Sequence, residues 1–349
     1  MLGCGGTTFR ADPARLGSVV TSVDGYPTVS VVIPAHSSAD SLREAVGSAL
    51  GQSLVAEVVI AVAPSSDTTS EVASTLALED PRVKVVPNPA GTTPAGLNQA
   101  IRSSRGDVIV RLDAHSCLPE GYVEDAVEVL RATGAGNVGG RQVPEGEGWL
   151  SCGVAQAMVS PLGAGGATYR TGVEAGSTDT VYLGVFDRVA LEAVGGFDER
   201  FVRNQDAELN LRLRAAGFDV WFDPRLQVSY RPRATLRGLA SQYFQYGRWR
   251  RATARIHPGS LRLRQVAAPS LVVAFAGAFV IGATGRRAVP LLLAGTYLGS
   301  LVTAIEVLGH RPRLPTFVAV VTMHLSWGLG FLMGPPRGFG GRPSSAEVV

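Results

Sequence analysis

Two residues of types that bind metal ions, Asp113 and His115, stand directly after an apolar run that extends from Asp107 to Leu112. A short β-branched run of this kind predicts a buried strand, and α/β folds build their sites at the carboxyl edge of a parallel sheet. A divalent cation that holds a diphosphate would sit at that edge. The alternative is structural, because an aspartate at the end of a strand often only caps the next turn. The tripeptide alone leaves both interpretations open.

The first half of the chain alternates the strand and helix patterns that would position these ligands. Strand patterns cover residues 29–33, 57–63, 82–86 and 107–112. Helices are expected from Ser41 and Thr68, which open capping-box patterns, and from Pro94, which suits a first helical turn. Strands separated by helices predict a parallel sheet with right-handed crossovers. We therefore expect one α/β domain over residues 27–235, with a Gly-rich mobile loop at 161–167.

The loop after the first strand argues against two common nucleotide sites. A Rossmann dehydrogenase needs G-x-G-x-x-G there, whereas Ile33 is followed by Pro34-Ala35-His36-Ser37. A P-loop motif, G-x-x-x-x-G-K, does not occur in the sequence. A nucleotide must therefore be held in another way, through loop backbone, carboxylates and a metal.

Charge divides the chain into two chemically different halves. Residues 1–223 carry 16 Lys and Arg against 27 Asp and Glu, whereas residues 225–264 carry ten Arg and no acid. This asymmetry indicates an acidic soluble domain and then a basic segment that faces anionic lipid or an anionic ligand. The alternative explanation is codon bias, which would favour arginine over lysine along the whole chain, since Lys84 is the only lysine. Such a bias would not gather the arginines in one segment. We expect no nucleic-acid partner.

Three apolar stretches without charged residues follow the basic segment, at 266–284, 288–305 and 314–336. We place three membrane helices at 266–284, 288–307 and 314–334, within a transmembrane region at 266–336, because each has about the 20 residues that cross a bilayer core. A buried soluble helical domain is the alternative. The basic segment itself, 236–264, is expected to form a helix in the membrane interface. Its apolar positions recur at helical spacing: Leu236, Leu239, Ala240, Tyr243, Tyr246 and Gly247.

Arginine positions predict a multi-pass protein of the cell membrane with a cytoplasmic catalytic domain. The ten arginines before the first span favour the cytoplasmic side, which places Arg286, Arg287 and the C-terminal tail, 337–349, outside. The N-terminal tail, 1–26, lacks the apolar core of a signal peptide. Cys4, Cys117 and Cys152 are odd in number and lack metal-type spacing, as expected of free thiols in a reducing compartment.

Several motifs in a fixed order resemble glycosyltransferase family 2, and most closely the succinoglycan-type group of bacterial exopolysaccharide glucosyltransferases. They are Val29-Ser-Val-Val-Ile-Pro-Ala35, Gly106-Asp-Val-Ile-Val-Arg-Leu-Asp-Ala-His115, Gly195-Gly-Phe-Asp-Glu199 and Asn204-Gln-Asp-Ala-Glu-Leu209. The resemblance covers roughly residues 28–250. It implies a GT-A-type, Rossmann-like α/β fold with a mostly parallel sheet flanked by helices, then an interfacial helix and about three C-terminal transmembrane helices.

The resemblance implies roles for individual residues. Asp113 and His115 correspond to the family's Asp-x-Asp metal motif, and the histidine predicts a preference for Mn²⁺ over Mg²⁺. A histidine that only supports the loop is the alternative. Asp206 corresponds to the catalytic aspartate, although it could simply cap a helix. The residues expected to bind the donor are Pro34, Ala35, His36, Asp67, Asn98, Arg111 and Asp113.

The donor nucleotide is less well marked in the sequence than the metal site. The family's loop after the second strand carries an aspartate that contacts uracil, but Val62–Thr69 retains only a later aspartate, Asp67. Asp67 could bind the base or cap the helix that follows. A UDP-hexose is the expected donor on the resemblance alone.

A further motif, Gln245-Tyr-Gly-Arg-Trp249, fits the Gln-x-x-Arg-Trp pattern of membrane-bound polysaccharide synthases. Arg248 is expected to pair with the diphosphate, and Trp249 to stack on an acceptor sugar or anchor at lipid headgroups. Gln205 and Gln245 complete the expected acceptor and diphosphate set. An amphipathic anchor whose arginines only meet lipid phosphates is the alternative.

Three functions fit these features. The first is an inverting transferase that adds one sugar to a lipid-linked saccharide at the inner leaflet. Its partners would be a nucleotide-sugar donor, the lipid-linked acceptor and membrane lipids, with a polysaccharide assembly complex as a further candidate. A processive synthase is disfavoured because three short spans leave little material for a pore. A non-catalytic binding protein would be expected to have lost the catalytic acidic residues, yet Asp113 and Asp206 are both present.

Overall fold

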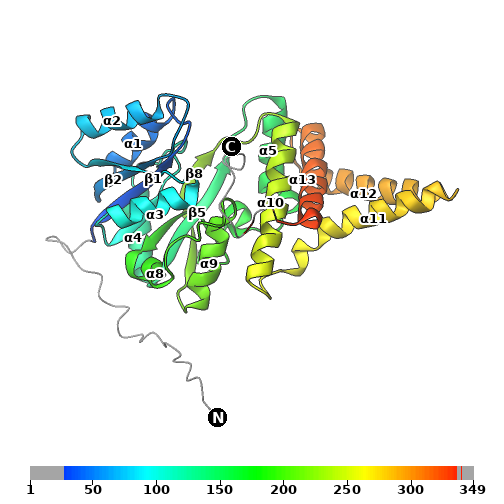
Figure 1. Ribbon diagram of the computed structural model, residues 1–349. Coiled ribbons are helices and arrows are strands. Elements are labelled where there is room, and N and C mark those ends of the chain that lie inside the picture. The colour runs from blue at the N-terminus through cyan, green and yellow to red at the C-terminus, as the bar shows by residue number, and fades with distance from the viewer. Residues whose placement is uncertain (1–26, 336–338, 340–349) are drawn as a thin grey trace, which may run out of the picture.

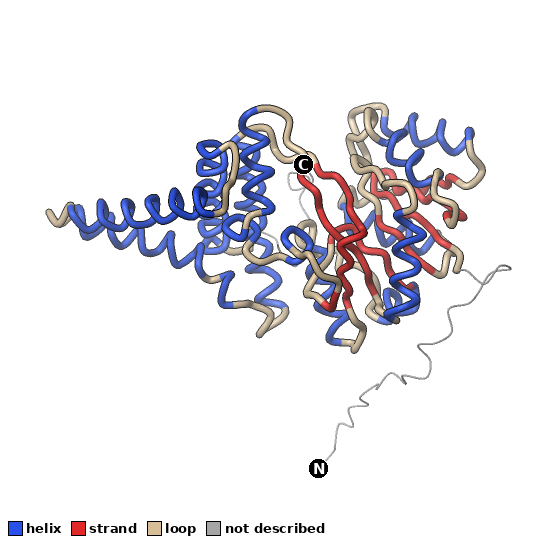
Figure 2. Tube along the Cα trace, turned by 180° about the vertical axis from the view of Figure 1, so that it is seen from behind, coloured by secondary structure: helices blue, strands red, loops and turns tan. Residues whose placement is uncertain are grey.

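The computed structural model describes residues 27–335 and Phe339. The expected N-terminal tail and the expected C-terminal tail, apart from Phe339, lie outside the described residues. An α/β domain is followed by a long helix beside it and by a helical hairpin that projects from it (Figure 1). The same arrangement is seen from behind in Figure 2.

The strands are β1 (Val29–Ala35), β2 (Val55–Val62), β3 (Val83–Pro87), β4 (Val108–Arg111), β5 (Asn137–Pro144), β6 (Gly176–Ser177), β7 (Tyr182–Asp187) and β8 (Val220–Tyr230). The helices of the α/β domain are α1 (Leu42–Leu50), α2 (Thr69–Glu79), α3 (Thr93–Ser103), α4 (Tyr122–Thr133), α5 (Trp149–Val159), α6 (Pro161–Ala164), α7 (Thr168–Thr171), α8 (Arg188–Ala193) and α9 (Gln205–Ala215). The later helices are α10 (Leu236–Ile256), α11 (Ala267–Ala283), α12 (Ala288–Val307) and α13 (Arg313–Met333).

The sheet is eight-stranded, in the order β3-β2-β1-β4-β7-β5-β8-β6. β1, β2, β3 and β4 are parallel, β7 runs antiparallel to both β4 and β5, and β8 is parallel to β5. The chain leaves β1 toward β2 on one side and later returns to place β4 on the other side. The prediction of a mostly parallel α/β sheet is therefore confirmed, and its topological switch point lies between β1 and β4.

β1 and β4 are buried on both faces, as parallel strands in α/β folds are. Alternate side chains face two separate hydrophobic clusters, because successive residues of a strand point to opposite faces. Val31 and Val110 pack in the cluster under α1, α2 and α4. Val32 and Ile109 pack in the cluster under α3, α8 and α9. These two layers fix the carboxyl ends of β1 and β4 relative to one another.

The predicted helix starts are confirmed, but their capping chemistry differs from the expectation. Ser41 and Thr68 are the N-caps of α1 and α2, and neither side chain caps its helix. The Ser41 hydroxyl instead donates to the carbonyl of Ala114 at 2.9 Å, which ties α1 to the loop that carries Asp113. The Gly-rich loop was predicted wrongly at its start: Pro161–Ala164 is a short helix, because Pro161 suits a first turn and Ser160 caps it.

α10 runs alongside α13, and α5 lies against α13 as well (Figure 1). Their contact buries a third hydrophobic cluster that includes Leu239, Tyr243, Val154, Ala319 and Met323. The apolar face of α10 was expected to meet the membrane interface. That prediction is wrong for Leu239 and Tyr243, because protein covers them.

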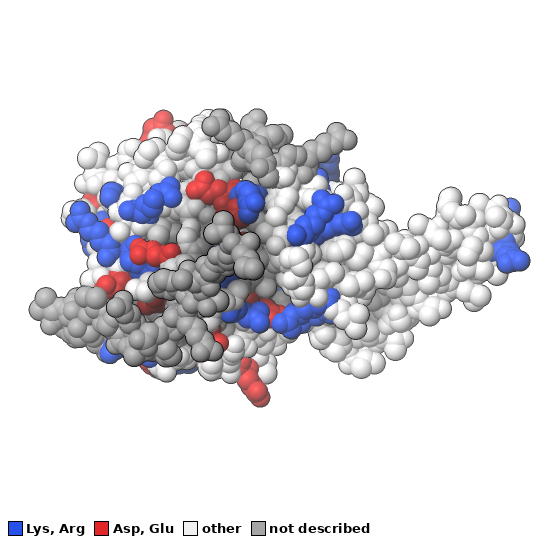
Figure 3. All heavy atoms as spheres, turned by 60° about the horizontal axis from the view of Figure 1, so that its bottom comes forward, with Lys and Arg blue, Asp and Glu red and all other residues white. Residues whose placement is uncertain are grey.

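Three helical segments are long and apolar enough to cross a membrane: Leu263–Ala283, which contains α11, and the helices α12 and α13. Their bounds agree with the expected spans within a few residues. Figure 3 shows that the projecting hairpin presents an uncharged surface, with Lys and Arg side chains gathered at its base and at its tip.

Candidate active site

The candidate site lies at the carboxyl ends of β1 and β4, at the switch point of the sheet. Pro34 and Ala35 end β1, and His36 follows it. Arg111 ends β4, and Asp113 follows two residues later. The register of the two parallel strands pairs Val32 with Arg111, so the sheet brings the expected donor-binding residues of both strands to one edge.

Arg111 joins two carboxylates from distant parts of the chain. Its Nη2 and Nε atoms donate to Oδ1 of Asp113 at 2.8 and 3.2 Å. Its Nη1 atom donates to Oδ1 of Asp206, which is 95 residues away in sequence. The Arg111 side chain is only 7% exposed, whereas those of Asp113 and Asp206 are 20% and 37% exposed. A buried guanidinium thus holds two reachable carboxylates side by side.

The surroundings shift the pKa values of Asp113 and Asp206 in opposite directions. Burial opposes ionisation of Asp113, but the positive charges of Arg111 and then His115 outweigh it, so the pKa of Asp113 lies below its ordinary value. Burial raises the pKa of Asp206, and the nearby Asp113 carboxylate adds to this against the opposing effect of Arg111. Paired acids whose pKa values are pushed apart are suited to different tasks. Asp113 is suited to bind a cation and Asp206 to accept a proton.

His115 is exposed, two residues after Asp113, and it helps to lower the pKa of that carboxyl group. Within residues 27–335, no group of three or more His, Cys, Asp or Glu side chains could hold a metal ion. A cation held by Asp113 and His115 would therefore need other ligands as well. Small divalent cations often bind one or two carboxylates and complete their coordination with water and substrate phosphates. The residues therefore fit a cation shared with a diphosphate.

Asp206 lies in the first turn of α9, where the helix dipole favours a carboxylate. Two contacts fasten this helix to α10: Asn204 Nδ2 donates to Thr253 Oγ1 at 2.8 Å, and His257 Nε2 lies 2.9 Å from Oε1 of the buried Glu208. We call these two contacts the α9–α10 clamp. It holds the start of α9, and with it Asp206, against the helix that precedes the apolar helices α11, α12 and α13.

The loops after β1 and β2 are bound to each other at the expected donor side. Ser37 N donates to Ser65 Oγ at 3.0 Å, and Ala39 N donates to Asp67 Oδ2 at 3.2 Å. Asp67 Oδ1 accepts from the hydroxyl of Thr69 at 2.7 Å, and this hydrogen bond lowers the pKa of Asp67. Asp67 therefore supports the start of α2 and joins the two loops, which is the capping role left open by the sequence.

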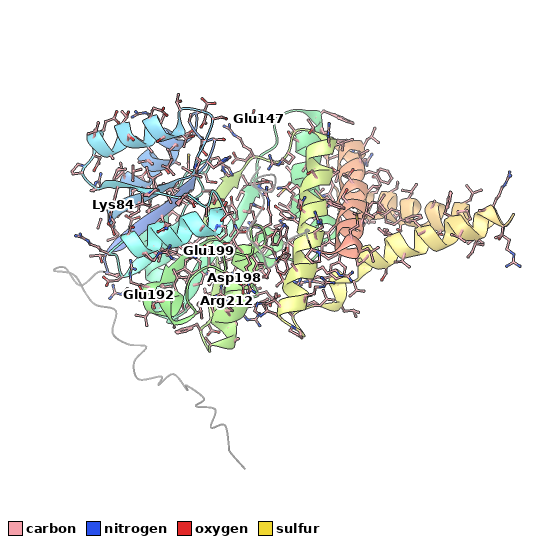
Figure 4. The ribbon with its side chains drawn as sticks, viewed as in Figure 1. Lys84, Glu147, Glu192, Asp198, Glu199 and Arg212 are labelled. Atoms are coloured by element: carbon pink, nitrogen blue, oxygen red, sulfur yellow. The ribbon has the colours of Figure 1, made fainter. Side chains whose placement is uncertain are left out.

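Asn98 does not face a donor, contrary to the expectation. Its Oδ1 accepts from Phe197 N at 2.9 Å, and its Nδ2 donates to Phe197 O at 2.8 Å and to Glu199 Oε1 at 3.0 Å. Its amide is thus occupied within the protein, and it fastens α3 to the Gly195–Glu199 loop. Figure 4 shows Asp198 and Glu199 of this loop between α3 and α9.

Replacing Asn98 with Ala is expected to destabilise the fold without weakening donor binding. The change leaves the backbone groups of Phe197 unpaired in a buried position, which lowers the free energy of unfolding by about 1–3 kcal/mol. Thermal unfolding and a donor binding isotherm on the same purified protein check this. Unchanged thermal stability together with a lost donor affinity would restore Asn98 to the donor site.

The Gln-x-x-Arg-Trp residues do not line an open acceptor surface. Trp249 is 3% exposed and packs against Phe201 and Phe339, with ring centroids 6.1 and 5.6 Å apart. Arg248 Nε donates to the carbonyl of Gly334 at 3.1 Å. The expected stacking or headgroup role of Trp249 is therefore wrong for this arrangement, because protein covers its ring. The expected diphosphate role of Arg248 stays a prediction, since the contact with Gly334 uses only its Nε atom. Gln245 lies half-buried on α10.

Gln205 is the first residue of α9, next to Asp206, and is half-buried.

The ion pair between Arg111 and Asp206 was not predicted from the sequence. One signal was present: Arg111 and Asp113 are two residues apart, so a strand would place them on one face. The link across 95 residues, and the α9–α10 clamp, have no local signal.

Comparisons with known proteins agree with this geometry. The model of the family described as Glycosyl transferase family 2 matches residues 30–195. The succinoglycan biosynthesis protein ExoA of Rhizobium meliloti (strain 1021) is 37% identical over 309 residues, which cover 86% of this chain and 93% of that protein. A second relative, from Methanococcus voltae, is 24% identical over 201 residues, 55% of this chain and 62% of its own length. It is named dolichyl N-acetyl-alpha-D-glucosaminyl phosphate 3-beta-D-2,3-diacetamido-2,3-dideoxy-beta-D-glucuronosyltransferase.

A solved structure shares the fold. The mannosyltransferase PcManGT from Pyrobaculum calidifontis, in complex with GDP-Man and Mn²⁺, matches with a TM-score of 0.61 and 18% identity over 91% of this chain and 92% of its own. The extensive identity to the Rhizobium meliloti protein, the family match and the ordered motifs agree. The chain belongs to glycosyltransferase family 2 and is a glycosyltransferase with a GT-A fold.

Proposed function

We propose that the protein transfers a hexose, with inversion, from a UDP-sugar to a lipid-linked saccharide at the cytoplasmic face of the membrane, in exopolysaccharide synthesis. The observation that carries this proposal is the chain of ion pairs from Asp113 through Arg111 to Asp206 at the switch point of the sheet. This arrangement supports the proposal because it holds two carboxylates, one suited to bind a cation and one suited to act as a base, close together at the edge where α/β folds bind ligands.

Asp206 would act as the general base. An acceptor hydroxyl is a weak nucleophile at neutral pH and needs a positioned base to take its proton. The raised pKa of Asp206 suits this task, and its 37% exposed side chain can be reached by an acceptor. The deprotonated oxygen attacks the anomeric carbon from the face opposite the diphosphate. An α-linked sugar nucleotide would then give a β-linkage.

Asp113 and His115 would hold a divalent cation together with the donor diphosphate. When bound, such a cation supplies Lewis-acid stabilisation of the negative charge on the departing diphosphate. The residues fit this role. Both hydrogen bonds that Arg111 donates to Asp113 go to Oδ1, and the lowered pKa of Asp113 keeps its carboxylate ionised. Arg111 keeps this carboxylate in place while the cation and donor arrive.

Mn²⁺ is expected to support faster transfer than Mg²⁺, because imidazole is a better ligand for Mn²⁺. Turnover measured with each metal at matched free concentrations tests this. His115→Ala should reduce the preference by lowering the Mn²⁺ rate more than the Mg²⁺ rate. Equal rates with the two metals in the wild type would show that His115 does not ligate the cation.

The acceptor and the pathway are supported by the relatives and by the membrane helices. The Rhizobium meliloti relative is named for succinoglycan biosynthesis, and the Methanococcus voltae relative for a dolichyl-phosphate-linked acceptor. Three helices within residues 27–335 are long and apolar enough to cross a membrane. An enzyme held at the membrane meets a lipid-linked acceptor directly, and a polysaccharide assembly complex is a further candidate partner.

A nucleotide-sugar panel tests the proposed function. Membranes containing the wild type or Asp113→Ala are supplied with each donor and with lipid extract, and nucleotide release and product size are scored. We expect release from a UDP-hexose by the wild type alone, with one sugar added to the acceptor. Ladders of long product would indicate a processive synthase. No release from any donor would indicate a non-catalytic binding protein.

A further inference from the structure

We propose that α13 lies in the plane of the membrane boundary beside α10, and that only α11 and α12 cross the bilayer. The residues after α13 would then lie on the same side of the membrane as the catalytic domain. This differs from the three spans expected from hydropathy, which place the two on opposite sides. The proposal concerns relative sides only and does not depend on which sugar is transferred.

The first half of α13 is held against the catalytic domain. Gly153 of α5 packs so closely that a Cβ there would lie 2.5 Å from the carbonyl carbon of Pro315, near the start of α13. Farther along, His324 Nε2 lies 2.8 Å from the carbonyl oxygen of Leu162 in α6. In the sequence, α5 and α6 both lie between strands β5 and β7, so they belong to the α/β domain. The start and the middle of α13 therefore rest on the same domain.

The second half of α13 is held by α10, which directly follows the last part of the sheet. A Cβ on Gly247 of α10 would overlap the carbonyl oxygen of Trp327, so the two backbones touch. Arg251 Nη1 then donates to the carbonyl of Phe331 at 3.1 Å, and Arg248 Nε donates to that of Gly334 at 3.1 Å. These bonds satisfy carbonyls that every helix leaves open at its C-terminal end.

These contacts run along the whole of α13, which is incompatible with a crossing. A helix of 21 residues is about 32 Å long, close to the thickness of the hydrocarbon core. If α13 crossed, its two ends would lie on opposite sides of the bilayer, and α10 would have to accompany it through the core. α10 carries five arginines and no acid, and such a helix does not cross.

α11 and α12 show the opposite behaviour. They project away from the catalytic domain as a hairpin (Figures 1 and 2). Only 11% of the residues in the most apolar 18-residue segment of each helix are buried within the protein. Arg262 and Arg264 lie at the base of the hairpin, where both contact Asp179. Arg286 and Arg287 lie in the turn at its tip. An apolar hairpin with basic residues at both ends matches a pair of crossings, which returns the chain to its starting side.

The outward face of α13 is suited to lipid. Its exposed apolar side chains recur at helical spacing: Leu314, Leu325, Leu329, Leu332 and Met333. Leu325 and Leu329 also form, with Val272 and Phe275 of α11, an apolar groove of about 310 Å³ where the hairpin leaves α13. This surface is continuous with the hairpin. The occupant we assign to it is the boundary layer of the bilayer, with acyl chains in the groove.

Cysteine labelling in whole cells tests the sides. In the full chain, with the three native cysteines replaced by serine, single cysteines are placed by Ser74→Cys on α2, Arg287→Cys at the hairpin tip and Ser345→Cys after α13. A membrane-impermeant maleimide is applied before and after permeabilisation. We expect Ser345→Cys to label with Ser74→Cys, and Arg287→Cys to label on the other side. Labelling of Ser345→Cys with Arg287→Cys, or of all three together, overturns the proposal.

Spin-label depth tests the orientation of α13 independently. Labels at Leu314, Leu325 and Leu332 sample the start, middle and end of its exposed face, and a label at Leu298, midway along α12, is the control. In reconstituted vesicles we expect the three α13 labels to share a shallow depth and Leu298 to lie deeper. A deep label at Leu325 between shallow ends would show that α13 crosses. Retained transfer activity confirms that each labelled protein is folded.

Discussion

Replacing Asp206 with Asn is expected to lower kcat for sugar transfer by about 10²–10⁴-fold, the usual contribution of a general base. The donor Kd should change little, because Asp113 still binds Arg111 in the absence of the second carboxylate. The amide keeps the size of the side chain but cannot accept the acceptor's proton. Single-turnover kinetics, together with a donor binding isotherm, separates the chemical step from binding.

The control for this variant is Glu79→Gln, which removes the carboxylate of an exposed ion pair with Arg43 and leaves the site untouched. It should transfer sugar at the wild-type rate, since exposed pairs contribute little to stability. If Asp206→Asn kept most of its activity, Asp206 would be only a helix-start residue. If it lost donor affinity in proportion to kcat, its main role would be in the donor site.

Replacing Asp113 with Ala is expected to abolish the cation-dependent part of donor binding. Lewis-acid stabilisation of a phosphoryl oxygen is worth several kcal/mol, so kcat/KM should fall at least about a hundredfold. The measurement is a donor titration by calorimetry with and without Mn²⁺. In the wild type the cation should tighten donor binding, and in the variant it should have no effect.

Asp80→Asn provides a matched control for Asp113. Asp80 and Arg82 form a pair two residues apart at 2.8 Å, the same spacing and distance as Arg111 and Asp113, but on an exposed turn. Loss of that pair should leave the effect of Mn²⁺ intact. A wild-type response to Mn²⁺ in Asp113→Ala would mean that Asp113 is a strand-end residue and that the cation, if used, binds elsewhere.

Local patterns were sufficient for the α/β fold and for the position of Asp113 at the edge of the sheet. The alternation of β-branched runs and capped helices placed β1, β2, β3 and β4, and the type of residue at the end of β4 marked Asp113. These features depend on neighbours in sequence, so a single chain contains them. Asp206 required the resemblance to a family, because an aspartate in the first turn of a helix has a common structural role.

The remaining features depend on which surfaces meet. Asn98 has the chemistry of a ligand, and only the tertiary structure shows that Phe197 and Glu199 occupy its amide. The apolar stripe of α10 correctly indicated an amphipathic helix. Hydrophobic periodicity cannot distinguish a lipid partner from a protein partner, since both exclude water equally well. For the same reason, the length and hydropathy of α13 did not show that α10 and α5 cover it.

The α9–α10 clamp has a consequence for the length of the product. If α10 lies at the membrane boundary as proposed, the clamp fixes the height of Asp206 above the bilayer. The distance of Asp206 from the membrane would then select the length of the acceptor. Only a hydroxyl on a sugar at the matching distance from the lipid phosphate would reach the base. Each addition carries the new end of the acceptor past this point. A rigid attachment between base and membrane would thus stop growth after one sugar, and its loosening would lengthen the product.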